Sequence, residues 1–215
     1  PTQAANQYGY NVTDNYQPEG AVNIAQTGQI LYQYNADKEW YPASMSKLMT
    51  MYLTLEAVNN GDLSLDDKVK ITDKHYRMST LPELSNTKLY PGETYTIKEL
   101  LQITVSNSSN AAALILGQEV SGNLSDFTDA MNKKAKSIGM KDTHFVNPTG
   151  AENKQLKDFA PKKYKNEENN TSTAKDFTIL AQRTIQDTPK IIYFTKQLAP
   201  TQHDVTYYIC LLYTS

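Results

Sequence analysis

A serine and a lysine three positions apart, Ser44 and Lys47, open a long apolar segment, and Ser108-Ser109-Asn110 follows later in the chain. On a helix, residues i and i+3 share a face, so Lys47 can hydrogen-bond the Ser44 hydroxyl. Burial and the positive end of a helix dipole both disfavour an ammonium, so this amine can take the serine proton near neutral pH. The chemistry indicated is acyl transfer through a covalent serine ester.

Context has to support this pattern, because a chain of this size contains about one Ser-x-x-Lys by chance. This chain has three, at 44–47, 85–88 and 172–175. The second lies in a Pro-bounded loop, where nothing fixes the serine against the lysine, and the third begins a helix whose capping residues already explain it. Only 44–47 falls in the first turn of a strongly apolar helix, and it is therefore the predicted catalytic pair.

Ser108 and Asn110 have a structural and a functional interpretation. They can be a loop hydroxyl and a helix cap, or a proton relay to a leaving amine and an amide that orients the substrate. Ser121-Gly122-Asn123 matches the same Ser-x-Asn pattern and reads as a plain glycine turn. The occurrence of both motifs in order, each at a helix edge, favours the functional interpretation.

The elements around these motifs follow from apolar periods and turn residues. Residues 1–19 are polar and predict an arm, and 21–34 predict a hairpin around Gln26-Thr27-Gly28. The first helix runs from Pro42 to Gly61. Four further helices are predicted: one after a capping box at 96–99, one over 111–120 capped by Asn110, one capped by Ser125 and ended by Gly139, and one after a capping box at 173–176. Between them the sequence predicts a loop-rich region over 62–95, a turn at 147–150 and a solvated loop over 154–170.

Composition narrows the function classes. With 215 residues, 39% of them hydrophobic, the chain can bury one core. A net charge of -2 gives no electrostatic field that would attract nucleic acid or an anionic membrane. The single cysteine forms no disulfide framework, and no histidine has a ligand partner at i+3 or i+4. We therefore expect no metal and no cofactor. No apolar run of ~18 residues is present to span a bilayer.

With these motifs located, the chain resembles the active-site serine D,D-peptidases, the low-molecular-mass penicillin-binding proteins of bacterial wall maturation, and among them those of Gram-positive cocci. The stretches that carry the resemblance are 20–47, 100–113, 139–150 and 172–180, so it covers about residues 20 to 200. It implies an α/β (α+β) fold of the β-lactamase/transpeptidase type. In that fold a helical cluster lies beside a five-stranded antiparallel sheet.

The resemblance also implies roles and partners. Ser44 would be the nucleophile, Lys47 the acylation base, Ser108 a proton shuttle and Asn110 a substrate-orienting amide. The substrate would be a peptidoglycan stem peptide ending in D-Ala-D-Ala, and a β-lactam would form a long-lived ester at Ser44. The expected location is the outer face of the bacterial membrane or the cell wall, with any membrane anchor beyond this chain.

The chain departs from that family's pattern at its end. The family's Lys-Thr-Gly or Lys-Ser-Gly strand, which binds the substrate carboxylate and supplies an oxyanion donor, occurs nowhere in the sequence. We therefore expect an incomplete domain over 20–208 that lacks the later sheet strands and is acylated poorly or not at all. Residues 209–215 carry the only cysteine and an apolar run that leads nowhere, and they resemble a non-native cloning junction.

Two other functions stay open on the sequence. A serine β-lactamase shares the first two motifs but adds a deacylating base, and Glu152 is the acid nearest to a suitable place. A non-catalytic β-lactam sensor or wall-binding module would be acylated at most once at Ser44. Rapid antibiotic turnover would favour the first, and a stable adduct without peptide cleavage the second.

Overall fold

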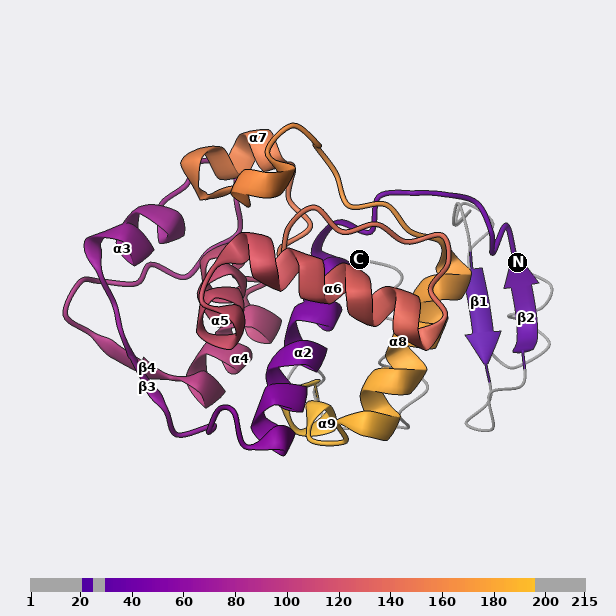
Figure 1. Ribbon diagram of the computed structural model, residues 1–215, viewed down its shortest axis with the longest axis horizontal. Coiled ribbons are helices and arrows are strands. Elements are labelled where there is room, and N and C mark those ends of the chain that lie inside the picture. The colour runs from indigo at the N-terminus through magenta and orange to yellow at the C-terminus, as the bar shows by residue number, and fades with distance from the viewer. Residues whose placement is uncertain (1–20, 25–29, 196–215) are drawn as a thin grey trace, which may run out of the picture.

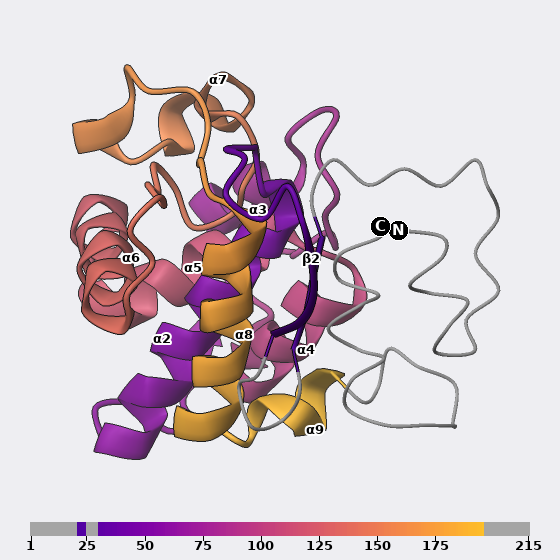
Figure 2. The same cartoon turned by 90° about the vertical axis from the view of Figure 1, so that its right-hand side faces the viewer.

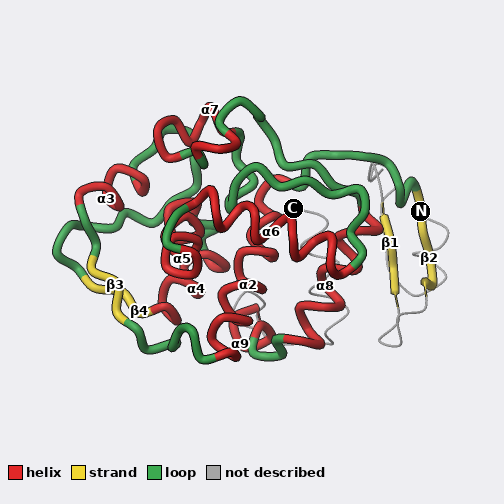
Figure 3. Tube along the Cα trace, viewed as in Figure 1, coloured by secondary structure: helices red, strands yellow, loops and turns green. Residues whose placement is uncertain are grey.

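Helices make up most of residues 21–24 and 30–195, the part of the chain that the computed structural model describes. Figure 3 shows two small pairs of strands at opposite ends of the molecule, with the helices between them. The elements in chain order are β1 Ala21–Ile24, β2 Ile30–Tyr34, η1 Ala43–Ser46, α2 Lys47–Asn60, β3 Lys68–Lys70, α3 Asp73–Ser79, β4 Thr94–Thr96, α4 Ile97–Ser106, α5 Asn110–Ser121, α6 Leu124–Ile138, α7 Asn153–Leu156, η2 Lys157–Phe159, η3 Lys162–Tyr164, α8 Ala174–Asp187 and α9 Ile191–Thr195.

Helix α2 runs through the middle of the molecule and packs against α5, α6 and α8 (Figures 1 and 2). Its apolar side chains belong to two buried clusters: Met51 and Leu55 lie in one, and Met49 and Tyr52 lie in the other. A helix that is apolar on every side is a core helix. It ends at Gly61, which adopts the left-handed conformation (φ +83°) that glycine tolerates.

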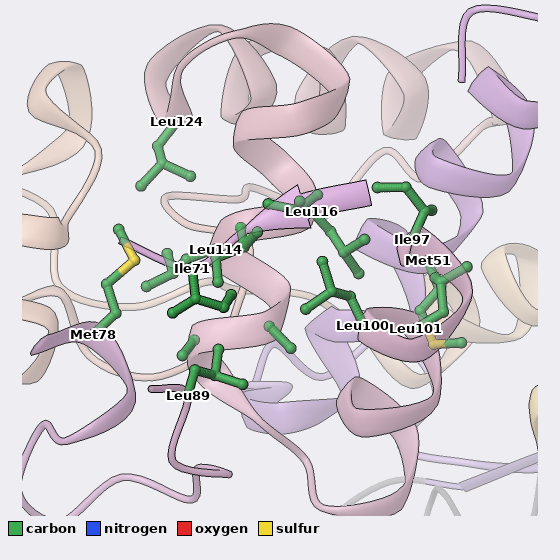
Figure 4. Close-up of a cluster of buried hydrophobic side chains, with 14 of the residues drawn as sticks. Met51, Ile71, Met78, Leu89, Ile97, Leu100, Leu101, Leu114, Leu116 and Leu124 are labelled. Carbon is green, nitrogen blue, oxygen red and sulfur yellow. The ribbon is translucent and has the colours of Figure 1, made fainter. Parts of the chain in front are cut away.

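The two clusters anchor the helix whose first turn carries Lys47. Figure 4 shows the first cluster, in which α2, α4 and α5 meet the β3–α3 segment; among its members are Ile71, Met78, Leu89, Leu100, Leu101 and Leu114. The second cluster joins α2 to α6 and α8 through Phe127, Met131, Phe145, Phe177 and Leu180. Side chains at this depth sit in close-packed surroundings, so the start of α2 has a fixed position.

Strands β1 and β2 pair antiparallel, with Ala21 opposite Tyr34, which confirms the predicted hairpin pairing. The predicted turn Gln26-Thr27-Gly28 lies outside the described residues, as do the arm 1–19 and the tail 209–215. Strands β3 and β4 also pair antiparallel, and α3 lies between them in the sequence. The prediction of a merely loop-rich region over 62–95 was therefore incomplete.

Two helix starts differ from the predictions. The capping box at Thr96 and Glu99 is confirmed. However, α5 is capped by Ser109 rather than Asn110, and α6 by Asn123 rather than Ser125. In each case the actual cap has extended backbone angles that let its side-chain oxygen accept an N–H from the first turn, whereas the predicted residue already lies inside the helix.

The region 154–170 is not simply a solvated loop. It contains the short helices η2 and η3 and part of α7, and Tyr164 and Asn170 within it are buried. At the next helix, Thr173 caps α8 as predicted, but the reciprocal half of the capping box is absent from this described segment. The Asp176 carboxylate instead accepts hydrogen bonds from the backbone N–H of Asp142 and the hydroxyl of Thr143, at 2.8 and 2.7 Å.

Candidate active site

The 3-10 turn η1 presents Ser44 to solvent and places Ser46 and Lys47 inside the protein. It runs directly into α2, so the first turn of this long helix follows the exposed hydroxyl. Ala43 has φ +47°, a left-handed conformation that is uncommon for a non-glycine residue. Such conformations cluster at functional sites, where the surrounding packing enforces them.

Lys47 is 5% exposed, and its Nζ donates a hydrogen bond to the carbonyl oxygen of Thr149 at 3.0 Å. Burial lowers the pKa of Lys47 from its ordinary value of 10.5 to about 8, because desolvation penalises the ammonium. A sizeable fraction of the amine is therefore neutral near physiological pH. In the described structure no hydrogen bond joins Lys47 Nζ to Ser44 Oγ, and the predicted direct contact is replaced by the contact with Thr149.

The turn 147–150, which the sequence predicted, packs against the first turn of α2. Thr50 Oγ1 donates to the carbonyl of Pro148 at 2.7 Å, one helical turn beyond the contact of Lys47 with Thr149. Gly150 has φ +85°, and an added Cβ would lie only 1.6 Å from the carbonyl oxygen of Ala43. Only glycine permits this approach.

The second motif lies in the connection between α4 and α5. Ser108 is half-buried and left-handed, with φ +49°. Asn110 is buried, and both its backbone N–H and its Nδ2 donate to the carbonyl of Ser85, at 3.1 and 2.9 Å. Helix α5 packs against α2, but among the described residues no hydrogen bond links Ser108 to Ser44 or Lys47.

Residues 85–86 hold this connection, a function that the sequence did not reveal. The side-chain oxygen of Asn86 accepts from the backbone N–H of Ala111 at 2.8 Å and from Ser109 Oγ at 3.5 Å. One asparagine in a Pro-bounded loop has no local signature of such a contact. The Ser-x-x-Lys match at 85–88 therefore contributes to the second motif through a backbone carbonyl and its asparagine.

The remaining pattern matches have structural roles. Ser172 is buried with its Oγ 2.7 Å from Thr143 Oγ1, while Lys175 pairs with Asp37 at the surface. In the match at 121–123, Asn123 is the cap of α6. At 172–175 the serine is buried and the lysine exposed, the reverse of 44–47.

Glu152, the acid considered as a deacylating base, caps α7 and lies 2.5 Å from Lys154 Nζ. Its carboxylate is thus engaged in local structure. Within residues 21–24 and 30–195, no group of three His, Cys, Asp or Glu side chains is arranged to hold a metal ion. Over the same residues, no helix combines the length and apolar character needed to cross a membrane.

Chemically, the arrangement offers an exposed hydroxyl and a buried, partly neutral amine at the N-terminal end of a long helix. Backbone N–H groups in the first turn of a helix generally lack intrahelical partners and can face a developing negative charge, although in η1 those of Met45 and Lys47 already bond carbonyls of the same turn. These groups suit nucleophilic attack on a carbonyl and stabilisation of the resulting oxyanion. The hydroxyl and amide of the second motif are the groups suited to the leaving amine and the substrate.

Comparisons with known proteins identify a peptidase family. The sequence profile of peptidase family S11, D-alanyl-D-alanine carboxypeptidase, matches residues 15–209. The carboxypeptidase DacF of Bacillus subtilis is 34% identical over 188 residues, which are 86% of this chain and 44% of DacF. The chain thus spans less than half the length of this relative.

Solved structures show the same fold. A peptidoglycan synthesis regulatory factor (PBP3) from Streptococcus pneumoniae superposes with a TM-score of 0.79 and 34% identity, over 86% of this chain and 51% of that one. Penicillin-binding protein D2 from Listeria monocytogenes, solved in an ampicillin-bound form, gives a TM-score of 0.68 and 31% identity, over 86% and 68%. The predicted transpeptidase-like α/β fold is confirmed, and the chain belongs to the D-alanyl-D-alanine carboxypeptidase family, the S11 peptidases.

Proposed function

We propose that this protein is a serine D-Ala-D-Ala carboxypeptidase or transpeptidase that acts on peptidoglycan stem peptides through an acyl-enzyme at Ser44. The observation that carries the proposal is the exposed Ser44 followed, one turn later, by a buried Lys47 whose pKa is lowered to about 8. A lysine base must lose its proton before it can accept another. Burial at this position provides that state.

The reaction proceeds in two displacements. Ser44 Oγ attacks the carbonyl of the penultimate D-Ala while Lys47 accepts the hydroxyl proton, and an oxyanion forms at the start of α2. Collapse breaks the peptide bond, Ser108 gives its proton to the leaving amine and takes in its place the proton held by Lys47, and D-Ala departs. Asn110 orients the stem peptide. Water, or an amine of a second stem peptide, then attacks the Ser44 ester and regenerates the hydroxyl.

A β-lactam follows the first displacement only. Its strained amide opens on Ser44, and the tethered leaving group keeps water from the ester. The ampicillin-bound form of the Listeria relative supports this, since that protein binds the drug. The substrate class places the reaction outside the cytoplasmic membrane, at the cell wall.

The expected pH dependence follows from Lys47. Its amine is the reactive form, so the rate of acylation should rise with pH through about 8 and level off above it. The measurement is the rate of labelling by a fluorescent penicillin between pH 6 and 10. A rate that is flat through pH 8 would contradict the assignment of Lys47 as the base.

Ser44→Ala should abolish labelling by a fluorescent penicillin, and Ser85→Ala is the matched control because it alters another Ser-x-x-Lys serine and keeps its backbone carbonyl. The test uses this chain and a longer form that continues into a Lys-Thr-Gly strand. We expect the longer form to label faster, since loss of one oxyanion donor costs about 10²- to 10³-fold. Label that survives Ser44→Ala, or no label on the longer form, would contradict the proposal.

Incubation with a D-Ala-D-Ala peptide then separates the alternatives. Release of D-Ala together with a stable penicillin adduct supports the peptidase. Rapid penicillin turnover would instead indicate a β-lactamase, and an adduct without D-Ala release a sensor or wall-binding module.

A further inference from the structure

Asn170 connects the Ser44 turn to a distant segment of the chain. Its side chain is 1% exposed, and Nδ2 donates to Ser46 Oγ at 2.8 Å and to the carbonyl of Asn147 at 3.1 Å. Its Oδ1 accepts from the backbone N–H groups of Val146 and Asn147, at 2.7 and 3.1 Å. Both donor hydrogens and both acceptor sites of this amide are therefore used.

Asn147 continues the connection and shapes the turn 147–150. Its Oδ1 accepts from the backbone N–H groups of Thr149 and Gly150 and from the Thr149 hydroxyl, each at 2.9 Å. Its Nδ2 donates to the carbonyl of Ala151 and to Asn153 Oδ1, at 2.7 and 3.0 Å. With its N–H groups turned inward in this way, the turn directs the Thr149 carbonyl to Lys47 Nζ.

The two asparagines thus form a buried path from Ser46 through Asn170 and Asn147 to the Thr149 carbonyl. We propose that Asn170 is a positioning residue for Lys47, because it clamps the turn that receives the amine to the turn that carries Ser44. The inference rests on the proposed role of Lys47 as the base. A neutral amine has two N–H donors and one lone pair, so a fixed carbonyl acceptor restricts where the lone pair points.

The hydrogen bonds of Asn170, which we call the clamp, also exclude water from the Lys47 amine. At Gly150 the two turns approach too closely to admit even a Cβ atom, and Lys47 is almost fully buried. Loss of the clamp would let the turns separate and admit water to Nζ. Hydration favours the ammonium, so the pKa of Lys47 should rise from about 8 toward 10.5.

The experiment compares Asn170→Ala with Asn132→Ala in the whole chain. Asn132 is a matched control, because its amide also bonds a backbone N–H and C=O in the same stretch, those of Phe145, at 2.7 Å each, without touching the Ser44 turn. Two quantities are measured: the rate of acylation by a fluorescent penicillin from pH 6 to 10, and the titration of Lys47 by NMR with 13Cε-labelled lysine. The Lys47 resonance is assigned by its loss in Lys47→Met.

In Asn170→Ala we expect the acylation rate at pH 7 to fall about 10- to 100-fold, since a catalytic group displaced by about 1 Å can cost on the order of 10²-fold. The midpoints of the rate profile and of the Lys47 titration should both move above 8, while Asn132→Ala keeps the parent midpoints. Unchanged midpoints in folded Asn170→Ala would overturn the proposal.

Two further outcomes keep the test decisive. If Asn170→Ala fails to fold, Ser46→Ala removes only the hydroxyl that receives Nδ2, and its midpoints decide by the same criterion. If neither this chain nor the longer form that continues into a Lys-Thr-Gly strand is labelled, the proposed function fails, yet the Lys47 titration still shows whether Asn170 controls the amine.

Discussion

Lys47 combines reactivity with a cost to stability. Its ammonium is nearly inaccessible to water, and among the described residues it has the Thr149 carbonyl as its hydrogen-bond acceptor but no carboxylate partner. A buried charge that lacks an opposite charge destabilises the folded state and shifts its pKa toward the neutral form. The same burial makes the amine available as a base.

Lys47→Met should therefore raise the free energy of unfolding at pH 7. The folded-state pKa of about 8 lies below the ordinary 10.5, so the unfolded chain binds more protons between these values, and the stability of the parent rises with pH across that window. The difference corresponds to about 3 kcal/mol, less about 1 kcal/mol for the lost hydrogen bond to Thr149. The expected net gain is about 2 kcal/mol at pH 7, and by pH 10.5 it should give way to a small loss, because only the missing hydrogen bond then remains.

Urea unfolding of the parent and the variant at both pH values measures this gain. Lys175→Met is the control, since Lys175 is exposed and its pKa is raised by Asp37 rather than lowered. Lys175→Met should not be more stable than the parent at pH 7. If Lys47→Met is less stable than the parent at pH 7, burial of the Lys47 ammonium does not destabilise the folded protein.

At the scale of elements, two turns and a helix start form the candidate site. The turn 147–150 packs on η1 through Gly150, and the loop at 85–86 packs on the start of α5 through Asn86. Each contact joins segments that are far apart in the sequence. The positions of the two motifs therefore depend on contacts with residues that belong to neither motif.

Gly150→Ala should be more damaging than Gly122→Ala. Both glycines have positive φ, +85° and +80°, so both substitutions incur a left-handed cost of about 1–2 kcal/mol. Only at Gly150 does the new methyl meet the carbonyl of Ala43, and overpacking adds about 1–3 kcal/mol. Urea midpoints should show this difference, and penicillin labelling should slow only in Gly150→Ala. Equal losses in the two variants would mean that the close approach is not maintained in solution.

The positions of the two motifs were predictable because their signals are local. An apolar run, a glycine stop and a capping box predicted α2 and α4, and the Ser-x-x-Lys at 44–47 was selected by its place at the start of the apolar helix. The partners of these motifs were not predictable. Thr149 lies 102 residues from Lys47, and neither Asn86 nor Asn170 differs in its local sequence from an ordinary loop asparagine. The missed caps at Ser109 and Asn123 differ from the predictions by one or two residues, where several polar residues compete for one backbone geometry.

At the scale of the molecule, α2 joins both hydrophobic clusters, whereas the β1–β2 pair lies beside α8 at one end (Figure 1). Local opening free energies follow the density of buried contacts. Amide hydrogens of α2 should therefore exchange most slowly, and those of β1 and β2 should be among the fastest of the paired strands and helices. Hydrogen exchange followed by mass spectrometry tests this order. Helix α8 is the internal reference because it has the same length of 14 residues, and it should exchange faster than α2.

The hydrogen bond between Ser46 and Asn170 spans 124 residues of chain. A ribosome that adds about 5–20 residues per second needs roughly 6–25 seconds to make that interval. Throughout this time Ser46 lacks the asparagine that ties it to the turn 147–150. If Ser44 is the nucleophile proposed above, the nascent chain presents it long before the residue that holds its turn in place has been synthesised.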